Sequence, residues 1–278
     1  MTIVFSLLRL IIIAITFFVV FSVIFFHFFQ EKLIYYPVKE LESTPDNAGV
    51  EYEDVYINTA DNIKIHAWYI PAGEKCVVFC HGNGGNNSYY LDRAVMLKEL
   101  GISVLLFDYR GYGRSEGELS EDGTYIDAEA AYSYVRDRGY SEEDIVIWGW
   151  SLGGAVAAGL ASERPASPLV LESTFTSLSD IAFEVYPFLR PLIRFQLRYR
   201  YNTAEYIRNS DNPLMIMASP EDEIVPFYMG KKLSEIRESR FVVLSGGHND
   251  SFLISRETIR DNLIEFLKTE ETKKKNIE

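Results

Sequence analysis

Cysteine is nearly absent from this chain of 278 residues, which contains only Cys76 and Cys80. Both lie in the run CVVFC, which is typical of a β-strand, and four residues of strand span about 13 Å. A disulfide needs Cα atoms within about 7 Å, so this spacing excludes a bridge between the two. We therefore interpret both cysteines as small core residues.

Basic residues are in deficit, with 27 lysines and arginines against 40 acidic residues and a net charge of −13. Nucleic acids are polyanions that bind basic surfaces, so this balance argues against a nucleic acid as partner. Internal repeats are absent too, which excludes a repeat architecture. About 220 residues remain after the N-terminal segment, enough for one α/β domain with a substantial core.

Charge is almost missing from residues 3–29, where Arg9 is the only charged side chain. As a helix, the apolar run at 10–29 is about 30 Å long and can span the hydrocarbon of a bilayer. A cleavable signal peptide has a shorter apolar core and a small-x-small cleavage site, and no such site follows this run. We expect an uncleaved, single-pass membrane anchor at 1–30. Its orientation is not determined, because basic residues flank the run in nearly equal number.

The remainder of the chain is expected to contain a linker at 31–49, a domain at 50–268 and a flexible tail at 269–278. The first two predicted strands follow one another directly, as in an antiparallel start, and the others alternate with helices. This order predicts a mostly parallel sheet with helices on both faces and ligands beyond the carboxyl ends of the strands. The predicted strands are 50–57, 63–70, 76–80, 102–107, 144–148, 168–172, 213–217 and 240–244, and the predicted helices are 88–101, 124–139, 152–163, 227–236 and 257–268.

The pattern Gly-x-Ser-x-Gly, which can mark the nucleophile of a serine hydrolase, occurs twice, as GRSEG at 113–117 and GWSLG at 149–153. Such a nucleophile needs a strand that runs straight into a tight turn and a helix that leaves it. Ser151 meets this requirement, because a β-branched and aromatic strand precedes it and a small-residue helix follows. Ser115 does not, because DYRGY separates GRSEG from the preceding strand and a polar, turn-like segment follows. We predict that Ser151 is the nucleophile and that GRSEG is either a structural turn or a rim of the active site.

Other loops at strand ends exclude two kinds of cofactor site and supply candidate acids and a histidine. HGNGGNNS lacks the Lys-Ser/Thr of a phosphate-binding loop, and GYGRSEG lacks the third glycine of a dinucleotide fingerprint. Neither a cofactor nor a metal is therefore expected. SPEDEIVP offers Glu221, Asp222 and Glu223 as acids. Of the four histidines, only His248 follows Ser151, in a loop directly after the last predicted strand.

On these motifs the chain resembles the α/β-hydrolase superfamily from about residue 33 to residue 268. Within it, the chain is similar to the single-pass, membrane-anchored branch described as serine-aminopeptidase-like or ABHD-like, some of whose members remove acyl groups from proteins. The order Ser…Asp…His matches the order of the triad in that superfamily. The motifs that carry the resemblance are LIYYP, HGNGGN, FDYRGYGRSEG, GWSLGG, SPEDEIVP and GGHND.

The resemblance implies a catalytic triad of three residues and an oxyanion hole formed by two others. Ser151 would be the nucleophile, His248 the general base, and Asp222 the acid that fixes the imidazole tautomer and stabilises the imidazolium. The backbone N–H groups of Asn83 and Leu152 would form the oxyanion hole. The implied fold is the α/β-hydrolase fold with a short cap insertion.

Residues 173–211 are expected to form this cap over the site. Phe183, Tyr186 and Phe188 give it an aromatic character suited to binding an acyl group. The alternative is that these rings pack the cap onto the core.

The cap is also basic, although the protein as a whole is acidic. Arg190, Arg194 and Arg198 are spaced by four, so on a helix they form one stripe, and Pro191 is acceptable in the first turn of such a helix. A basic stripe beside apolar residues suits a helix that lies on an anionic membrane surface. The alternative is that these arginines pair with acids of the domain and dock the cap.

We therefore expect a membrane-tethered serine hydrolase that cleaves carboxylic esters or thioesters through an acyl-enzyme intermediate. Its expected partners are an acyl substrate and the lipid bilayer, and its oligomeric state is not determined. One alternative is an amino- or acylpeptidase, which would need an acidic residue in the pocket for the amino terminus of its substrate. Another is a non-catalytic binding or scaffold protein that has kept the fold. A chain that begins near Leu41 is expected to be soluble and active on short-chain esters.

Overall fold

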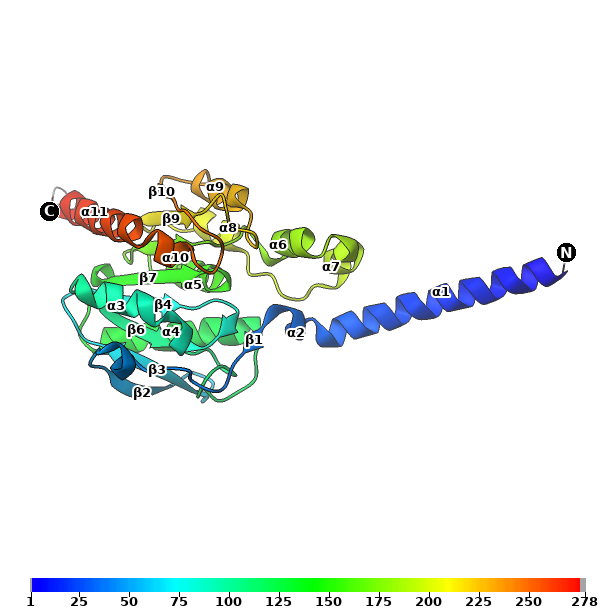
Figure 1. The fold of residues 1–278 in the computed structure, drawn as a ribbon, viewed down its shortest axis with the longest axis horizontal. Helices are drawn as coiled ribbons and strands as arrows, with labels where there is room; N and C mark the ends of the chain where they lie inside the picture. Colours follow the sequence, from blue (N-terminus) through cyan, green and yellow to red (C-terminus); the bar gives the residue numbers. More distant parts are fainter. Residues whose placement is uncertain (1, 276–278) are drawn as a thin grey trace.

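A sheet of eight strands forms the centre of the part of the chain that the structure, a computed structural model, describes, which is residues 2–275 (Figure 1). In sheet order the strands are β10 (Arg240–Val243), β9 (Leu214–Ala218), β8 (Leu169–Glu172), β7 (Ile145–Trp150), β4 (Cys76–Cys80), β6 (Ser103–Phe107), β3 (Lys64–Ile70) and β2 (Glu53–Asn58). β2 pairs antiparallel with β3 and β3 with β6, and the other neighbours are parallel. The predicted mostly parallel sheet with an antiparallel start is therefore confirmed.

Helices cover both faces of this sheet, as predicted. One face carries α4 (Glu121–Asp137), α5 (Leu152–Ser162), α8 (Thr203–Arg208) and α9 (Phe227–Ser234). The other carries α3 (Leu91–Glu99), α10 (Ser251–Ile254) and α11 (Arg256–Lys275). Short 3-10 turns are η1 (Pro45–Ala48), η2 (Asn87–Tyr90) and η3 (Glu142–Asp144).

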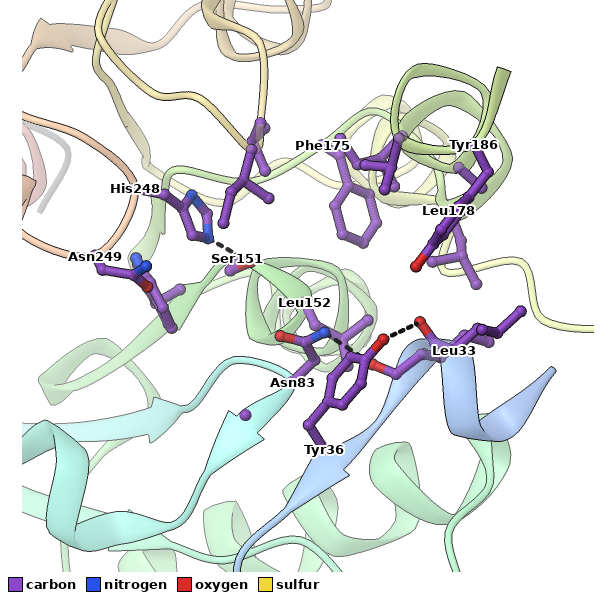
Figure 2. A pocket seen from close by; sticks show the side chains of 18 of the residues that line it. Leu33, Tyr36, Asn83, Ser151, Leu152, Phe175, Leu178, Tyr186, His248 and Asn249 are labelled. Atoms are coloured by element: carbon purple, nitrogen blue, oxygen red, sulfur yellow. Dashed lines mark hydrogen bonds between the residues drawn. The ribbon is translucent and has the colours of Figure 1, made fainter. Parts of the chain in front are cut away.

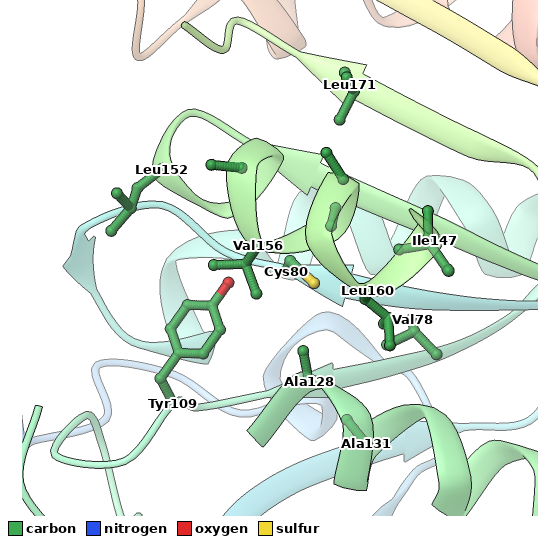
Figure 3. Close-up of a cluster of buried hydrophobic side chains, with 14 of the residues drawn as sticks. Val78, Cys80, Tyr109, Ala128, Ala131, Ile147, Leu152, Val156, Leu160 and Leu171 are labelled. Carbon is green, nitrogen blue, oxygen red and sulfur yellow. The ribbon is translucent and has the colours of Figure 1, made fainter. Parts of the chain in front are cut away.

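Small side chains let the central helices approach the sheet closely. Ala128 and Ala131 of α4 lie beside α5 in the core, together with Cys80 of β4 (Figure 3). Cys76 and Cys80 are both fully buried and unbridged, which confirms that they are core residues.

The C-terminal helix α11 is longer than the sequence predicted. It continues to Lys275, so residues 269–275 are helical where a flexible tail was expected, and residues 276–278 lie outside the described residues. The segment TEETKKK contains no glycine or proline, and its glutamates precede lysines by four positions, a spacing that supports a helix.

The cap consists of α6 (Leu178–Val185), η4 (Pro187–Leu189) and α7 (Arg190–Gln196). It is smaller than the segment 173–211 that the sequence indicated, because α8 returns to the sheet and packs against α5. α6 and α7 project beyond the sheet on the side from which the N-terminal helix leaves (Figure 1). Pro191 lies in the first turn of α7, as expected. The helix ends at Gln196, before Arg198, so Arg198 is not part of a helical stripe with Arg190 and Arg194.

The N-terminal helix α1 (Thr2–Phe29) extends away from the rest of the molecule (Figure 1). Within the described residues, it is the one helix long and apolar enough to cross a membrane, over Val4–Phe29. Most of its apolar side chains are exposed, so it is not a core helix of the α/β domain.

Residues 31–49 are not a free linker, in contrast to the prediction. α2 (Glu31–Ile34) follows α1, and β1 (Tyr36–Pro37) pairs in parallel with β5 (Gly84–Gly85). Ile34 and Tyr35 are buried in the main core. The apolar run LIYYP explains this packing, because burial of its side chains offsets the entropy lost on ordering the segment.

Candidate active site

Ser151 occupies the tight turn between β7 and α5, as its sequence context predicted. Its backbone has a φ of 54° and a ψ of −120°, a strained region for a residue with a side chain. Glycine is required on both sides of the turn. A Cβ at Gly149 would collide with the carbonyl oxygen of Gly153, and a Cβ at Gly153 would collide with that of Cys80.

Two hydrogen bonds connect Ser151 to His248 and His248 to Asp222, and Figure 2 shows the first of them. His248 Nδ1 lies 2.8 Å from Asp222 Oδ2, and His248 Nε2 lies 3.0 Å from Ser151 Oγ. A carboxylate only accepts, so Nδ1 carries the proton and Nε2 accepts from the serine hydroxyl. All three side chains are buried, although they come from loops after three different strands. This arrangement can activate a serine hydroxyl as a nucleophile.

Asp222 and its two acidic neighbours bind different groups. Asp222 Oδ1 accepts from the backbone N–H groups of Ile224 and Val225, at 2.9 and 2.7 Å, which fixes the carboxylate. Glu221 accepts from the N–H of Gly246 at 3.2 Å. Glu223 accepts from the backbone N–H of His248 at 3.0 Å. Of these three acids, only Asp222 contacts the imidazole, and the supporting bonds of the other two were not predicted.

Asn83 and Leu152 line the same cavity as Ser151 (Figure 2). Leu152 is the first residue of α5, where a backbone N–H has no partner within the helix. The Asn83 carbonyl oxygen accepts from the Tyr36 N–H at 2.8 Å and from the Tyr112 hydroxyl at 2.7 Å, while its side-chain amide donates to the Ile34 carbonyl at 2.8 Å. These bonds hold the side chain and the carbonyl group of Asn83 in one position.

Two further tyrosines fix the same loop. The Tyr109 hydroxyl donates to the carbonyl of His81 at 3.2 Å, and the Tyr90 hydroxyl donates to that of Gly84 at 3.0 Å. Burial raises the pKa of both tyrosines, which keeps their hydroxyls protonated as donors. The sequence carried no signal for these contacts, because a tyrosine hydroxyl can reach many partners.

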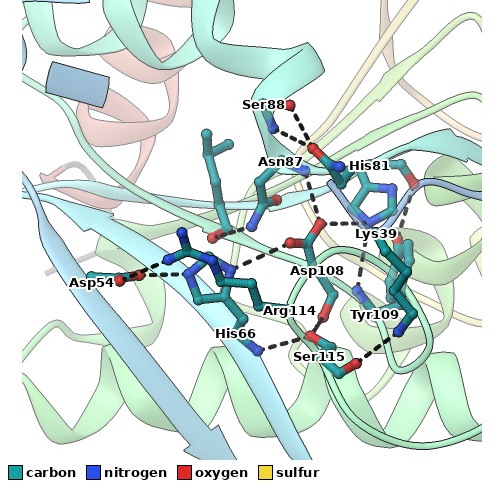
Figure 4. Close-up of polar contacts among 12 residues, drawn as sticks. Lys39, Asp54, His66, His81, Asn87, Ser88, Asp108, Tyr109, Arg114 and Ser115 are labelled. Carbon is teal, nitrogen blue, oxygen red and sulfur yellow. Dashed lines mark hydrogen bonds and ion pairs between the residues drawn. The ribbon is translucent and has the colours of Figure 1, made fainter. Parts of the chain in front are cut away.

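Ser115 stabilises the backbone of its loop rather than lining the cavity (Figure 4). Its hydroxyl donates to the Asp108 carbonyl and accepts from the His66 N–H, at 2.8 Å each, and the side chain is buried. Nearby, Arg110 is held by ion pairs with Asp127 and Asp61. The described cavity residues include none from GRSEG, so the structural turn, rather than the rim, is the interpretation that fits.

A cavity of about 950 Å³ is lined by Ser151 and His248, among other residues (Figure 2). Its size is within the range of small-molecule sites, about 300–1,000 Å³. Its lining includes Asn83, Ser151, Leu152, Phe175, Glu223 and His248 from the α/β domain, Leu178, Ile181, Val185, Tyr186, Ile193 and Leu197 from the cap region, and Phe26, Gln30, Leu33, Ile34 and Tyr36 from the N-terminal segment. The contribution of the N-terminal segment was not predicted.

Of the three cap aromatics predicted to bind substrate, only Tyr186 lines this cavity. Phe188 is 95% exposed, because η4 interrupts the cap helices and turns this ring outward. Phe183 lies on α6 but off the helical face that lines the cavity, and the guanidinium of Arg190 covers its ring at 6.0 Å. The predictions for Phe183 and Phe188 were therefore wrong, and Phe188 does not pack the cap onto the core either.

Comparison with known proteins identifies the family. The pattern of the alpha/beta hydrolase family matches residues 77–211. The alpha/beta hydrolase domain-containing protein WAV2 of Arabidopsis thaliana is 34% identical over 269 residues, covering 86% of this chain and 87% of WAV2. The uncharacterized membrane protein YNL320W of Saccharomyces cerevisiae is 32% identical over 265 residues, covering 88% and 92%.

The solved structure of the Pyrococcus furiosus esterase Pf2001 has the same fold, with a TM-score of 0.72 at 24% sequence identity, covering 85% of this chain and 97% of the esterase. The chain therefore belongs to the alpha/beta hydrolase family.

Proposed function

We propose that this protein is a membrane-anchored serine hydrolase that cleaves carboxylic esters or thioesters of acyl groups. The observation that carries the proposal is the pair of hydrogen bonds that connect Ser151 to His248 and His248 to Asp222, beside a largely apolar cavity that Ser151 and His248 line. An acyl chain fits apolar walls, and its carbonyl then lies beside the serine hydroxyl.

The proposed reaction has two steps. The Ser151 oxygen attacks the acyl carbonyl carbon while His248 Nε2 takes the hydroxyl proton, and Asp222 stabilises the imidazolium. The N–H groups of Asn83 and Leu152 donate to the developing oxyanion. His248 then protonates the departing alcohol or thiol, which leaves an acyl-enzyme. Water attacks this ester with His248 as base, and the carboxylic acid and free Ser151 are released.

A peptidase is the second candidate, and one observation favours it. Glu223 lines the cavity, and a carboxylate there could receive the amino terminus of a peptide. Its Oε2 atom, however, accepts the backbone N–H of His248. The apolar character of the other walls supports the acyl substrate. Relative rates on acyl p-nitrophenyl esters and aminoacyl p-nitroanilides separate the two candidates.

Membrane anchoring rests on α1 and on its connection to the fold. A cleaved leader would contribute nothing to the mature domain, whereas Phe26 is 6% exposed and Gln30 is 1% exposed in contacts with the rest of the protein. These buried positions support an uncleaved helix. The relative YNL320W, which is named a membrane protein, is consistent with this proposal.

A fluorophosphonate probe, which reacts with activated serines, tests the proposed activity. We expect the wild type to be labelled and to hydrolyse acyl esters, and Ser151→Ala to lose both properties. Ser115→Ala is the matched control in the second Gly-x-Ser-x-Gly pattern. It should stay reactive but lose about 1–3 kcal/mol of stability, because it leaves two buried backbone groups unpaired. An unlabelled, folded wild type would favour the non-catalytic alternative instead.

A further inference from the structure

The end of the N-terminal helix forms a wall of the cavity that contains Ser151. Phe26 belongs to this end, Gln30 follows directly after it, and Leu33 and Ile34 lie in α2. In Figure 2, Leu33 and Tyr36 lie across the cavity from Leu178 and Tyr186 of the cap region. The cavity therefore connects the reactive serine with the residues that enter and leave the apolar helix.

This wall is fixed to the cap by hydrogen bonds. The Gln30 side-chain amide donates to the carbonyl of Gln196 at 3.4 Å and accepts from the backbone N–H of Arg198 at 2.9 Å. The Tyr199 hydroxyl donates to the Glu31 carboxylate at 2.6 Å. A buried amide with both of its functions paired defines one docking geometry. The helix end and the cap are therefore one structural unit.

The length of α1 places this unit at the boundary of a bilayer. The helix has 28 residues and is roughly 42 Å long, against a hydrocarbon thickness of about 30 Å. If the uncharged run at 10–29 fills the hydrocarbon, Phe26 lies just inside it and Leu33 just outside. The part of the cavity that Phe26 and Leu33 line is then next to the acyl chains and ester groups of the lipids.

The exposed face of the cap matches this position. Phe188 and Phe195 are 95% and 78% exposed, on either side of Arg190 and Arg194 in the sequence. No ion pair joins either arginine to a carboxylate among the residues whose side chains are described. Exposed aromatic rings beside cations are typical of a surface in the headgroup region. α7 packs against α1, so both elements meet the bilayer at the same level.

We infer that the enzyme takes a long-chain acyl ester or thioester directly from the bilayer that holds its anchor. The chain enters between the end of α1 and the cap, against Phe26 and Leu33, and the carbonyl reaches Ser151. The substrate class is thus an acyl group whose parent molecule resides in the membrane. This inference rests on the proposed hydrolase function and adds its route of entry.

A variant that narrows the proposed entry path tests whether the chain enters along the wall that contains Leu33. Full-length enzyme in vesicles of phosphatidylcholine and phosphatidylglycerol is assayed with a soluble butyryl ester and with a long-chain fluorogenic ester. Leu33→Trp places an indole in the entry path, so the ratio of long-chain to short-chain rates should fall by at least about tenfold. Phe28→Trp is the control, because Phe28 is exposed on the same helix end and is not a described lining residue. It should change the ratio by less than about twofold.

Two arms of the experiment identify the source of the substrate. A two-chain lipid ester that stays in its bilayer is placed either in the enzyme's own vesicles or in separate vesicles. We expect hydrolysis at least about tenfold faster when enzyme and ester share a bilayer. Equal rates in the two arms, or an unchanged ratio for Leu33→Trp, would overturn the inference.

A second measurement does not depend on the folding of a variant. A long-chain fluorophosphonate with a photoreactive group at the chain end reacts with Ser151 and is then irradiated. Crosslinks should map to residues 26–34, and crosslinks confined to the α/β domain would contradict the proposed wall. Absence of probe reaction and of short-chain hydrolysis in the wild type would mean that the proposed function has failed, which is a different result from a failed route of entry.

Discussion

Asp222 is distinguished from Glu221 and Glu223 by the group that each carboxylate binds. Asp222 contacts the imidazole of His248, whereas the glutamates accept only backbone N–H groups in the bonds described for them. An amide at 222 could keep the bonds from Ile224 and Val225, but it would direct an N–H toward His248 and favour the wrong tautomer.

We predict that Asp222→Asn lowers kcat on a short-chain p-nitrophenyl ester by about 10⁴, the scale known for triad acids in other enzymes. Glu221→Gln and Glu223→Gln keep a carbonyl acceptor for the same N–H groups, so their kcat should stay within about threefold of the wild type. Steady-state kinetics on folded variants decide this. A severe loss in Glu221→Gln with a near-normal Asp222→Asn would move the acid to Glu221.

At this scale the sequence predicted the residues that the structure brings together. Ser151 was predicted because a strand, a tight turn and a helix are local patterns, and His248 because it lies in a loop at the end of a predicted strand. The loop positions left Glu221, Asp222 and Glu223 open as the acid, and the family resemblance singled out Asp222. Trp150 was not predicted, although its ring lies 4.9 Å from that of His248. Its neighbour is distant in the sequence, so no local pattern reports the contact.

The cap is the element in which the sequence interpretation failed most. The eight strands of the large sheet were predicted because most are continuous apolar runs, which are buried on both faces. Five of the seven helices that cover this sheet were predicted, and the short helices α8 and α10 were not. In the cap, Tyr186 and Pro187 interrupt the helical pattern, and Arg198 follows the end of α7 and pairs with Glu31 at 3.9 Å. That partner is 167 positions away and lies in α2, not in the α/β domain, so neither alternative drawn from the sequence described it.

The charges that remain on the exposed cap give a prediction for this element. We expect Arg190→Gln combined with Arg194→Gln to lower hydrolysis of a long-chain ester in anionic vesicles by up to about thirtyfold, because each basic residue near the surface contributes about 1 kcal/mol. Activity on a soluble short-chain ester should not change. The measurement is a comparison of both rates in anionic and in neutral vesicles.

A charge-matched control is Arg208→Gln combined with Lys231→Gln, since both side chains are exposed outside the cap. This variant should behave as the wild type on all vesicles. A parallel fall of both activities in the cap variant, with a lower melting temperature, would show that these arginines stabilise the cap instead.

For the whole molecule, the proposed anchor α1 predicts where the protein is found. Full-length protein should remain with membranes under high salt and alkaline carbonate and dissolve in detergent, because about 20 apolar residues leave the bilayer only at a large cost in free energy. Fractionation followed by immunoblotting measures this. Release by salt alone would indicate peripheral attachment.

The segment between the proposed anchor and the domain also contacts Asn83, which changes the expectation for a shortened chain. A chain that begins near Leu41 lacks the Tyr36 N–H and the Ile34 carbonyl, both of which hold Asn83. We therefore predict at least about tenfold lower kcat on short-chain esters than for the full chain in detergent. A chain that begins at Phe25 keeps these contacts and is the control. Full activity of the shorter chain would restore the original expectation of an independent domain.

The pairing of Gln30 with Arg198 has a consequence for the order of biosynthesis. These two residues are 168 positions apart, so at 5–20 residues per second the ribosome reaches the second roughly 8–34 s after the first. By then the apolar helix has emerged and is available for insertion. If the proposed anchor inserts as it emerges, the cap docks onto a helix end that is already in the bilayer, and the protein completes its folding at the membrane surface.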